Sequence, residues 1–453
     1  MENLPEPLIL EILTRLNDST ESTRTRLTSK TFNSAYPHLK SINLQYPLTQ
    51  YLKSRSINPQ PITPFKEIFS KMVENLLRVE SVCIGVDKRM RDVSFDDDVE
   101  GEGDGDDLWL SDGGWVGEWL GRVCGGLRRV SISDFWVQSC WRRSCLLSLL
   151  SGSCHNLVEL EVKNAWLSVE NLNPMPMLTS LTLEFIRLDD EDLNELNRCF
   201  PNLEVLNLIG VGGFKLPKIH LLNLKTCHWT VSNVPSSLAL ITPNLITLRL
   251  ECIRPTSLYV EAPMLSNFRL SLDQPEAFAV KKFQNLKTLW LESLFIGSLL
   301  LKFPITDTVD NLTLDSRNWA KGAFKSSQFT LEKVFTVFPN VSTLCINSSA
   351  WSELESCSDP EGWEMTTGRK GLKTFNVYLL LVDPSLTFSS VACVLDQCVG
   401  LSNVSLLIYH DVVANVSKSF ISKCMARWPK VKWRWGMWKE GKEDSWIMDV
   451  ISD

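Results

Sequence analysis

The acidic stretch at about residues 92–114 is the part of the sequence that comes closest to a metal-binding motif. The ligand spacing of a calcium-binding loop is matched in order by Asp96, Asp98, Glu100, Gly101 and Asp107. Gly103 stands where such a loop has an apolar residue, and the last ligand is not the Glu that the motif requires. The flanking sequence predicts no helices. We therefore expect a solvated acidic loop rather than a calcium site.

The histidines and cysteines form no pattern that predicts catalysis or metal binding. Five histidines are far apart in the sequence: His38, His155, His220, His228 and His410. There is no HExxH motif, C-x-x-C pair, GxSxG elbow, phosphate-binding loop or dinucleotide fingerprint. The 13 cysteines lack zinc-ligand spacing, which favours reduced and mostly buried thiols. We expect a non-enzymatic protein with no catalytic residues, no metal site and no cofactor.

Composition narrows the class of protein further. The chain of 453 residues has 44% apolar and 22% charged residues, which is ordinary for a soluble globular protein. Its net charge of −7 disfavours a nucleic-acid partner. The N-terminus does not resemble a signal peptide, and no apolar run is long enough for a membrane-spanning helix. These features predict a protein of the cytoplasm and/or nucleus, with no nucleic acid and no membrane as partner.

One phrase recurs along most of the chain: an apolar residue, two variable residues, an apolar residue, one variable residue and a third apolar residue. It begins at Val79, Leu127, Leu157, Leu178, Leu203, Ile219, Leu245, Leu265, Leu286, Val309, Val341, Leu372 and Leu401. Such self-similarity is typical of a leucine-rich-repeat solenoid. The last two apolar residues of each phrase face the same side of a strand, and a single strand cannot bury that side alone. The repeat predicts an α/β solenoid, a horseshoe with parallel β-strands on its concave face.

Two kinds of residue accompany the phrase. Asn often precedes it, with Pro before the Asn, and this pair predicts a turn before each strand. Tryptophans follow nine or ten residues after a phrase begins: Trp136, Trp166, Trp229, Trp319 and Trp351. We expect these rings to fill the space behind the strands, with a ligand-binding aromatic row as the alternative. The Trp-rich end at about 428–450 is expected to cap the last repeat, with a partner-binding patch as the alternative.

Residues 4–44 do not fit the repeat and predict a small all-α module. Apolar residues at helical spacing mark one face of a first helix: Ile9, Ile12, Leu13 and Leu16. A second, polar helix is expected from about Thr20 to Phe32. The stretch from Asp18 to Arg26 is nearly all polar, so one interpretation of the module is a cap over the first repeat.

This segment resembles the F-box, a three-helix module, in Leu4-Pro5, Ile9, Ile12-Leu13, Leu16, Leu27, Ser29-Lys30 and Phe32. A module of this kind followed by leucine-rich repeats is similar to plant F-box/LRR-repeat proteins. The resemblance implies an F-box at 1–45, a linker at 46–75 and a repeat domain at 76–453. It also implies that a Skp-type adaptor, which joins a cullin and a RING subunit, is contacted by Leu4, Pro5, Ile9, Ile12, Leu13 and Leu16.

The function implied is that of a substrate-recognition subunit of an SCF-type ubiquitin ligase, with an unknown target protein bound by the repeats. The strand phrase places side chains of the types that dominate binding energy on the concave face: Arg249, Arg269, Trp290 and Tyr378. The alternative is a leucine-rich-repeat scaffold outside any ligase, or a small-molecule-sensing receptor. In that case the F-box-like segment is only an N-terminal cap.

Overall fold

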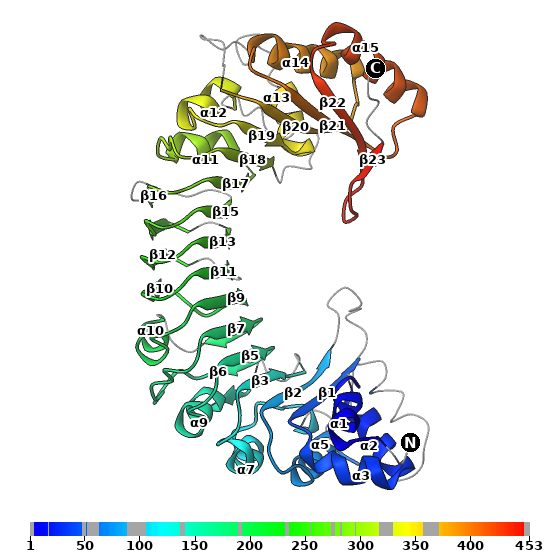
Figure 1. Ribbon diagram of the computed structural model, residues 1–453. Helices are drawn as coiled ribbons and strands as arrows, with labels where there is room; N and C mark the ends of the chain where they lie inside the picture. Colours follow the sequence, from blue (N-terminus) through cyan, green and yellow to red (C-terminus); the bar gives the residue numbers. More distant parts are fainter. Residues whose placement is uncertain are drawn as a thin grey trace. The chain divides into compact units, whose positions relative to one another are not determined.

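The structure is a computed structural model in which two compact units, Met1–Asn233 and Val234–Asp453, are distinguished (Figure 1). It describes residues 4–16, 18–47, 51, 63–87, 106–135, 141–188, 193–231, 235–253, 255–272, 277–280, 283–294, 296–316, 329–356 and 371–447.

The first unit starts with helices and continues as a ladder of parallel strands. Its elements are α1 (Glu6–Thr14), α2 (Ser19–Thr28), α3 (Lys30–Ala35), η1 (Tyr36–His38), β1 (Ser41–Pro47), α5 (Phe65–Glu74), β2 (Ser81–Asp87), α7 (Gly113–Val123), β3 (Arg129–Ser133), β4 (Arg143–Ser144), α9 (Leu146–Ser153), β5 (Glu159–Lys163), β6 (Trp166–Leu167), β7 (Ser180–Glu184), β8 (Arg187–Leu188), α10 (Asn194–Cys199), β9 (Val205–Val211), β10 (Lys218–Ile219) and β11 (Thr226–Val231). The main sheet of this unit runs in the order β1-β2-β3-β5-β7-β9-β11, and every pairing in it is parallel.

The second unit is also built on parallel strands, which are closed by one antiparallel strand. Its elements are β12 (Ser237–Ile241), β13 (Thr247–Cys252), β14 (Ser257–Glu261), β15 (Asn267–Leu272), β16 (Ala277–Val280), β17 (Thr288–Ser293), α11 (Ile296–Lys302), β18 (Asn311–Ser316), α12 (Leu331–Val337), β19 (Thr343–Ile346), α13 (Ser348–Ser356), β20 (Thr374–Leu379), α14 (Pro384–Gln397), β21 (Asn403–Tyr409), α15 (Ala414–Arg427), β22 (Lys432–Trp438) and β23 (Ser445–Ile447). Its main sheet runs β13-β15-β17-β18-β19-β20-β21-β22-β23, and β12-β14-β16 form a second ladder behind it.

The repeated sequence phrase explains the main sheets of both units. In β5 and β7 the buried Leu160 and Val162 lie opposite Leu181 and Leu183, and the same two positions are apolar and buried in the following strands. Each strand therefore buries its apolar side against its neighbours, as a stack of repeats requires. The predicted α/β solenoid with parallel strands and an N-terminal all-α module is confirmed.

One predicted phrase is wrong in its position. The sequence predicts a strand with Ile219, Leu222 and Leu224 inward, but Leu222 is 57% exposed and lies in a turn. The strand is β11, in which Cys227 and Trp229 are buried and pair with β9. Apolar spacing alone did not distinguish a phrase that starts at Ile219 from one that starts at Leu224, because Cys227 and Trp229 replace leucines in the second one.

The asparagines before the phrases form a ladder of side-chain hydrogen bonds along the turns. Asn202 donates through Nδ2 to the carbonyl of Pro176 at 2.9 Å, and Asn223 donates to that of Pro201 at 3.1 Å. Asn285 and Asn340 make the same kind of bond to the preceding repeat. Each amide thus satisfies a turn carbonyl that the strand ladder leaves without a donor.

Repeat length determines what lies behind the strands of the second unit. Phrases at Leu245, Leu265 and Leu286 are 20 and 21 residues apart, and the short strands β12, β14 and β16 form the segments that lead from one main-sheet strand to the next. From Val309 the spacing rises to 32, 31 and 29 residues, and these connecting segments contain α12, α13 and α14. A helix advances about 1.5 Å per residue against about 3.3 Å for a strand, so a helical return needs more residues than an extended one. The seven residues of α11 already fit in the 23-residue repeat between Leu286 and Val309.

The last strands carry most of the described tryptophans of the C-terminal region. Trp435 and Trp438 of β22 are buried, and the Trp433 ring stacks on that of Trp435 with centroids 5.2 Å apart. The short β23 pairs antiparallel with β22. Because Trp435 and Trp438 are buried, they fit a cap on the last repeat better than a partner-binding patch. Trp136 and Trp319 lie outside the described residues.

The ranges predicted as linker and acidic loop contain ordered elements. The range 46–75 holds the end of β1 and all of α5, and the range 92–114 is described from residue 106 onward. Asp107 accepts hydrogen bonds from the backbone N–H groups of Phe65 and Lys66, which begin α5. Asp134, which is fully buried, accepts the N–H and the O–H of Ser111. The carboxylates of Asp107 and Asp134 therefore hold residues 106–112 against the rest of the first unit.

The buried Asp134 predicts a pH dependence of stability. Burial raises the pKa of this carboxyl from 3.8 to about 7, against the hydrogen bonds from Ser111. Between about pH 4 and pH 7 the folded chain keeps a proton that the unfolded chain releases, so unfolding free energy falls as pH rises through this window. The unfolding free energy of Asp134→Asn does not depend on this titration. Its difference from that of the wild type should therefore shift in favour of the variant by on the order of 3 kcal/mol between pH 5 and pH 8. Denaturant unfolding of both proteins measures this, and parallel pH profiles would contradict it.

Candidate functional site

The N-terminal helices enclose a small core of their own. Pro7 in the first turn and Glu6 at the N-terminal end favour the start of α1 at this point. Ile9 and Leu13 of α1 face inward and are only 2% and 1% exposed. The other buried members of this core are Phe32, Ala35, Tyr36 and Leu39.

Two of the six residues predicted to contact an adaptor belong to this core. Ile9 and Leu13 hold α1 on α3 and η1, so their side chains are not available to a partner in the folded module. Leu16 is partly buried against the same core. Leu4, Pro5 and Ile12 are exposed, and their contact with an adaptor stays a prediction.

Leu8 and Ile12 of α1 lie about a quarter turn around the helix from the buried Ile9 and Leu13, and Leu4 stands just before the helix begins at Glu6. Leu4, Leu8 and Ile12 are 38%, 52% and 40% exposed, and we call them the outer stripe. The helix is thus apolar on two sides, one for its own core and one open to solvent. The sequence reasoning missed Leu8, although its distance of four residues from Leu4 and from Ile12 was a usable signal.

The second helix is held by polar contacts. Asp18 caps α2 by accepting the N–H of Thr20 at 2.8 Å, and Ser22 is the residue that this helix buries. The Thr23 hydroxyl lies 3.2 Å from that of Tyr36, and the Arg26 guanidinium lies over the Tyr36 ring at 4.8 Å. The predicted single helix from Thr20 to Phe32 is divided in two, because Ser29 is extended and caps α3.

The module is joined to the first strands by direct contacts. The backbone N–H of Asn43 in β1 donates to the Ser19 hydroxyl at 2.8 Å, and the N–H of Leu77 donates to the Pro37 carbonyl at 2.9 Å. Leu76, which follows α5, packs against the core of the module. The outer stripe therefore has a fixed position relative to β1 and β2.

A second candidate surface is the face of the main sheet in the second unit that points away from the buried side, here called the open face. Arg249, Arg269 and Trp290 occupy paired positions in β13, β15 and β17. The Arg269 guanidinium lies 4.1 Å from the centre of the Trp290 ring, which is cation–π geometry. Arg249 pairs with Glu251 at 2.6 Å, and Arg269 lies 3.6 Å from Glu292.

Two donors of this row are shielded from solvent without an acceptor. The indole N–H of Trp290 and the Nε of Arg269 make no hydrogen bond within the described residues. Next to them, burial raises the pKa of the Asp315 carboxyl, against the hydrogen bond that Asn347 donates at 2.6 Å. The open face is therefore a partly desolvated polar surface with an aromatic ring near its middle.

Tyr378, the fourth residue predicted on this face, is engaged by the C-terminal end of the chain. Its hydroxyl donates to Asp444 at 2.8 Å, and its ring meets that of Trp438 edge-on at 5.8 Å. Burial and the bond to Asp444 raise the pKa of the hydroxyl. Tyr378 is half-buried by these contacts, so it is less available to a partner than the other three residues. No sequence pattern predicts this contact, since Asp444 lies outside the repeat, in the connection between β22 and β23.

The described residues offer little for catalysis. No three His, Cys, Asp or Glu side chains among them come close enough to hold a metal ion. Burial raises the pKa of the Cys227 and Cys345 thiols to about 12, which leaves them poor nucleophiles at neutral pH. Within the same part of the chain, no helix has the length and apolar character needed to cross a bilayer.

Comparison with known proteins assigns the architecture to a family. No family model matches the chain. A curated plant relative, F-box/LRR-repeat protein At4g29420 of Arabidopsis thaliana, is 44% identical over 99% of this chain and 100% of its own length. The chain belongs to the plant F-box/LRR-repeat family. In this F-box/LRR-repeat protein, helices α1 to α3 fit the F-box and the parallel strands are the repeats.

The two sides of α1 predict different effects of the same substitution. Leu13→Asp places a carboxylate in the core of the F-box and should destabilise it by about 3 kcal/mol or more. Ile12→Asp places the charge in solvent and should change stability by less than about 1 kcal/mol. Hydrogen exchange of residues 4–39 in the full chain reports both effects. Equal loss of protection in the two variants would show that α1 is not oriented as described.

Proposed function

We propose that this F-box/LRR-repeat protein is the substrate-recognition subunit of an SCF-type, cullin-RING ubiquitin ligase. The F-box binds a Skp-type adaptor, and through it the cullin and RING subunits, while the repeats bind a target protein. The chain itself catalyses no reaction. It holds a target lysine near a charged conjugating enzyme, so its contribution to the reaction is proximity. We place this activity in the cytoplasm and/or nucleus.

The observation that carries the proposal is the outer stripe. Leu8 and Ile12 expose apolar surface on a side of α1 next to the side that is already packed, and Leu4 adds to this surface just before the helix begins. A row at intervals of four residues fits recognition of a helix by an apolar groove. Completing their burial would contribute about 1 kcal/mol per side chain, since each is already about half covered. A cap that only closes the first repeat has no need of this second apolar side.

The open face of the second unit supports target binding by the repeats. Trp290 and Arg269 are residue types that dominate binding energy, and each keeps a shielded donor without an acceptor. A target that supplies carboxylate oxygens would pair with the exposed part of the Arg269 guanidinium, whose side chain is 35% exposed, beside the Trp290 ring. Arg249, at the exposed end of the same row, is held by Glu251 in a fixed orientation. Tyr378 belongs to this surface only if the Asp444 contact opens.

The second candidate is a scaffold or small-molecule-sensing receptor whose F-box serves as a cap. The contacts of Ser19 with Asn43 and of Leu76 with the F-box core favour it, because they are the contacts that a cap makes. The polar character of α2 also favours the cap. The two candidates differ in one property, which is whether the outer stripe binds an adaptor.

The deciding experiment is binding of the full chain to a plant Skp-type adaptor, measured by calorimetry. Leu8→Asp and Ile12→Asp should weaken binding by about tenfold or more, since each places a charge in an apolar contact. Leu216→Asp is the matched control, because Leu216 is equally exposed at 54% and lies outside the F-box. Circular dichroism confirms that all three variants are folded. Adaptor binding that survives both substitutions would show that the outer stripe is not the contact, and a folded wild type that binds no adaptor would favour the cap.

A further inference from the structure

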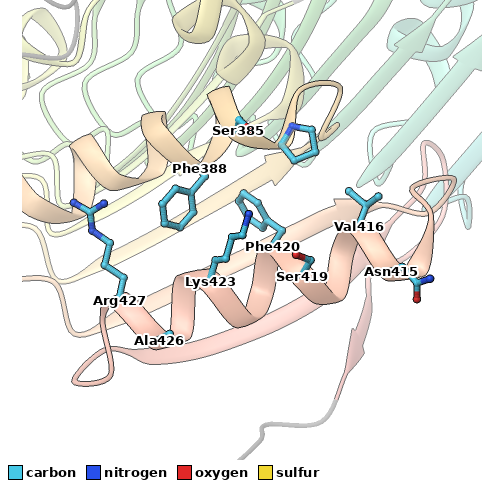
Figure 2. A pocket seen from close by; sticks show the side chains of 10 residues that line it. Ser385, Phe388, Asn415, Val416, Ser419, Phe420, Lys423, Ala426 and Arg427 are labelled. Carbon is cyan, nitrogen blue, oxygen red and sulfur yellow. The ribbon is translucent and has the colours of Figure 1, made fainter.

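The helical side of the last repeats contains a groove that neither the F-box nor the open face uses. It lies between α14 and α15, which are neighbours behind the sheet of the second unit (Figure 1). The groove has a volume of about 840 Å³. Figure 2 shows side chains of both helices directed into the space between them.

The floor of this groove is apolar and fixed. Phe420 is buried, and its ring meets that of Phe388 at a right angle with centroids 6.4 Å apart. The Phe388 ring also rests on Trp428 at 5.9 Å. Val416 lines the groove one helical turn before Phe420. An apolar side chain entering from outside would therefore find preformed ring surface.

The rim of the groove is basic. Arg427 is anchored by Asp396 of α14 at 2.6 Å, and the same carboxylate accepts the indole N–H of Trp428 at 2.9 Å. Lys423, one turn before Arg427, makes no ion pair with any described residue. It is exposed beside the floor of the groove and is available to a partner carboxylate.

The segment that begins with α15 is basic, in contrast to the whole chain. Residues 414–442 contain eight Lys and Arg and a single Glu, while the full sequence has a net charge of −7, and two of the eight, Lys423 and Arg427, line the groove. The eight cations are Lys418, Lys423, Arg427, Lys430, Lys432, Arg434, Lys439 and Lys442. Such a local excess attracts an acidic partner to this end of the molecule.

We propose that the groove between α14 and α15 binds an amphipathic helix of another protein, with apolar residues on the floor and acidic residues against Lys423 and Arg427. Two adjacent helices accept a third in their groove by ordinary ridge-and-groove packing. The apolar contacts would recur every three or four residues along the partner. Nucleic acid fits less well, because the groove offers ring edges and one unpaired cation instead of a row of them.

This proposal adds a third binding surface and is independent of adaptor binding. Its test uses the full chain and a displayed library of helices of about 16 residues, with varied apolar residues on one side. One half of the library carries acidic flanks and the other half basic flanks. We expect enrichment of acidic-flanked helices alone. Enrichment of neither half, or of both equally, would overturn the proposal.

Three variants locate the binding of the selected helices. Lys423→Glu should weaken it by about fivefold or more, because it replaces attraction with repulsion at the rim. Lys418→Glu, an exposed change on the same helix outside the groove, should weaken it less than about twofold. Ser419→Trp should abolish binding by filling the groove. Equal losses in Lys423→Glu and Lys418→Glu would assign the binding to general charge and overturn the proposal.

Two further probes separate the other polyanions, and adaptor affinity serves as a fold control. Oligothymidine and phosphatidylserine vesicles are tested with the same variants. If either binds and depends on Lys423 while no helix is enriched, the groove takes that polyanion instead and the proposal is wrong. Affinity for the Skp-type adaptor should be unchanged in all three groove variants, so failure here is distinguishable from failure of the ligase role.

Discussion

Every element of this protein depends on the inability of a single short strand to bury its own apolar side. A strand such as β5 presents Leu160 and Val162 to one side, and only the next strand with the same spacing can cover them. Stacking in register also leaves the intervening side chains in rows on the opposite side. The arrangement of Arg249, Arg269 and Trp290 as neighbours is a direct consequence of that register. These rows are the part of the repeats that we propose for target binding.

The same constraint operates at the ends of the stack and shapes the terminal modules. At the N-terminal end, Ile9 and Leu13 of α1 are buried in the core of the F-box, and Leu76 packs against the same core. The backbone of β1 joins the F-box through the bond from Asn43 to Ser19. The apolar side chains of Leu8 and Ile12 on α1 stay partly exposed, and together with Leu4 they form the outer stripe. At the C-terminal end, Trp435 and Trp438 supply the covering surface, and the short β23 completes the edge.

The repeats and the order of modules were predictable from the sequence because their signal is repeated many times. The strand at 226–231 was missed, since Cys227 and Trp229 take the place of leucines. The sequence did not show which apolar residues of α1 face the core of the F-box itself, because a helix that is apolar on two sides fits more than one helical face, and packing decides between them. The contact of Tyr378 with Asp444 joins residues far apart in the sequence through a turn outside the repeat, so no local pattern announces it.

We propose that the outer stripe contacts an adaptor while the repeats remain free for a target. The most direct test places a photo-cross-linking residue at Leu8 in the full chain and illuminates it with a plant Skp-type adaptor. We expect a cross-link from position 8 and none from position 216, which is similarly exposed and outside the F-box. If a folded chain forms no cross-link at position 8, or forms it equally at both positions, the outer stripe is not the adaptor contact.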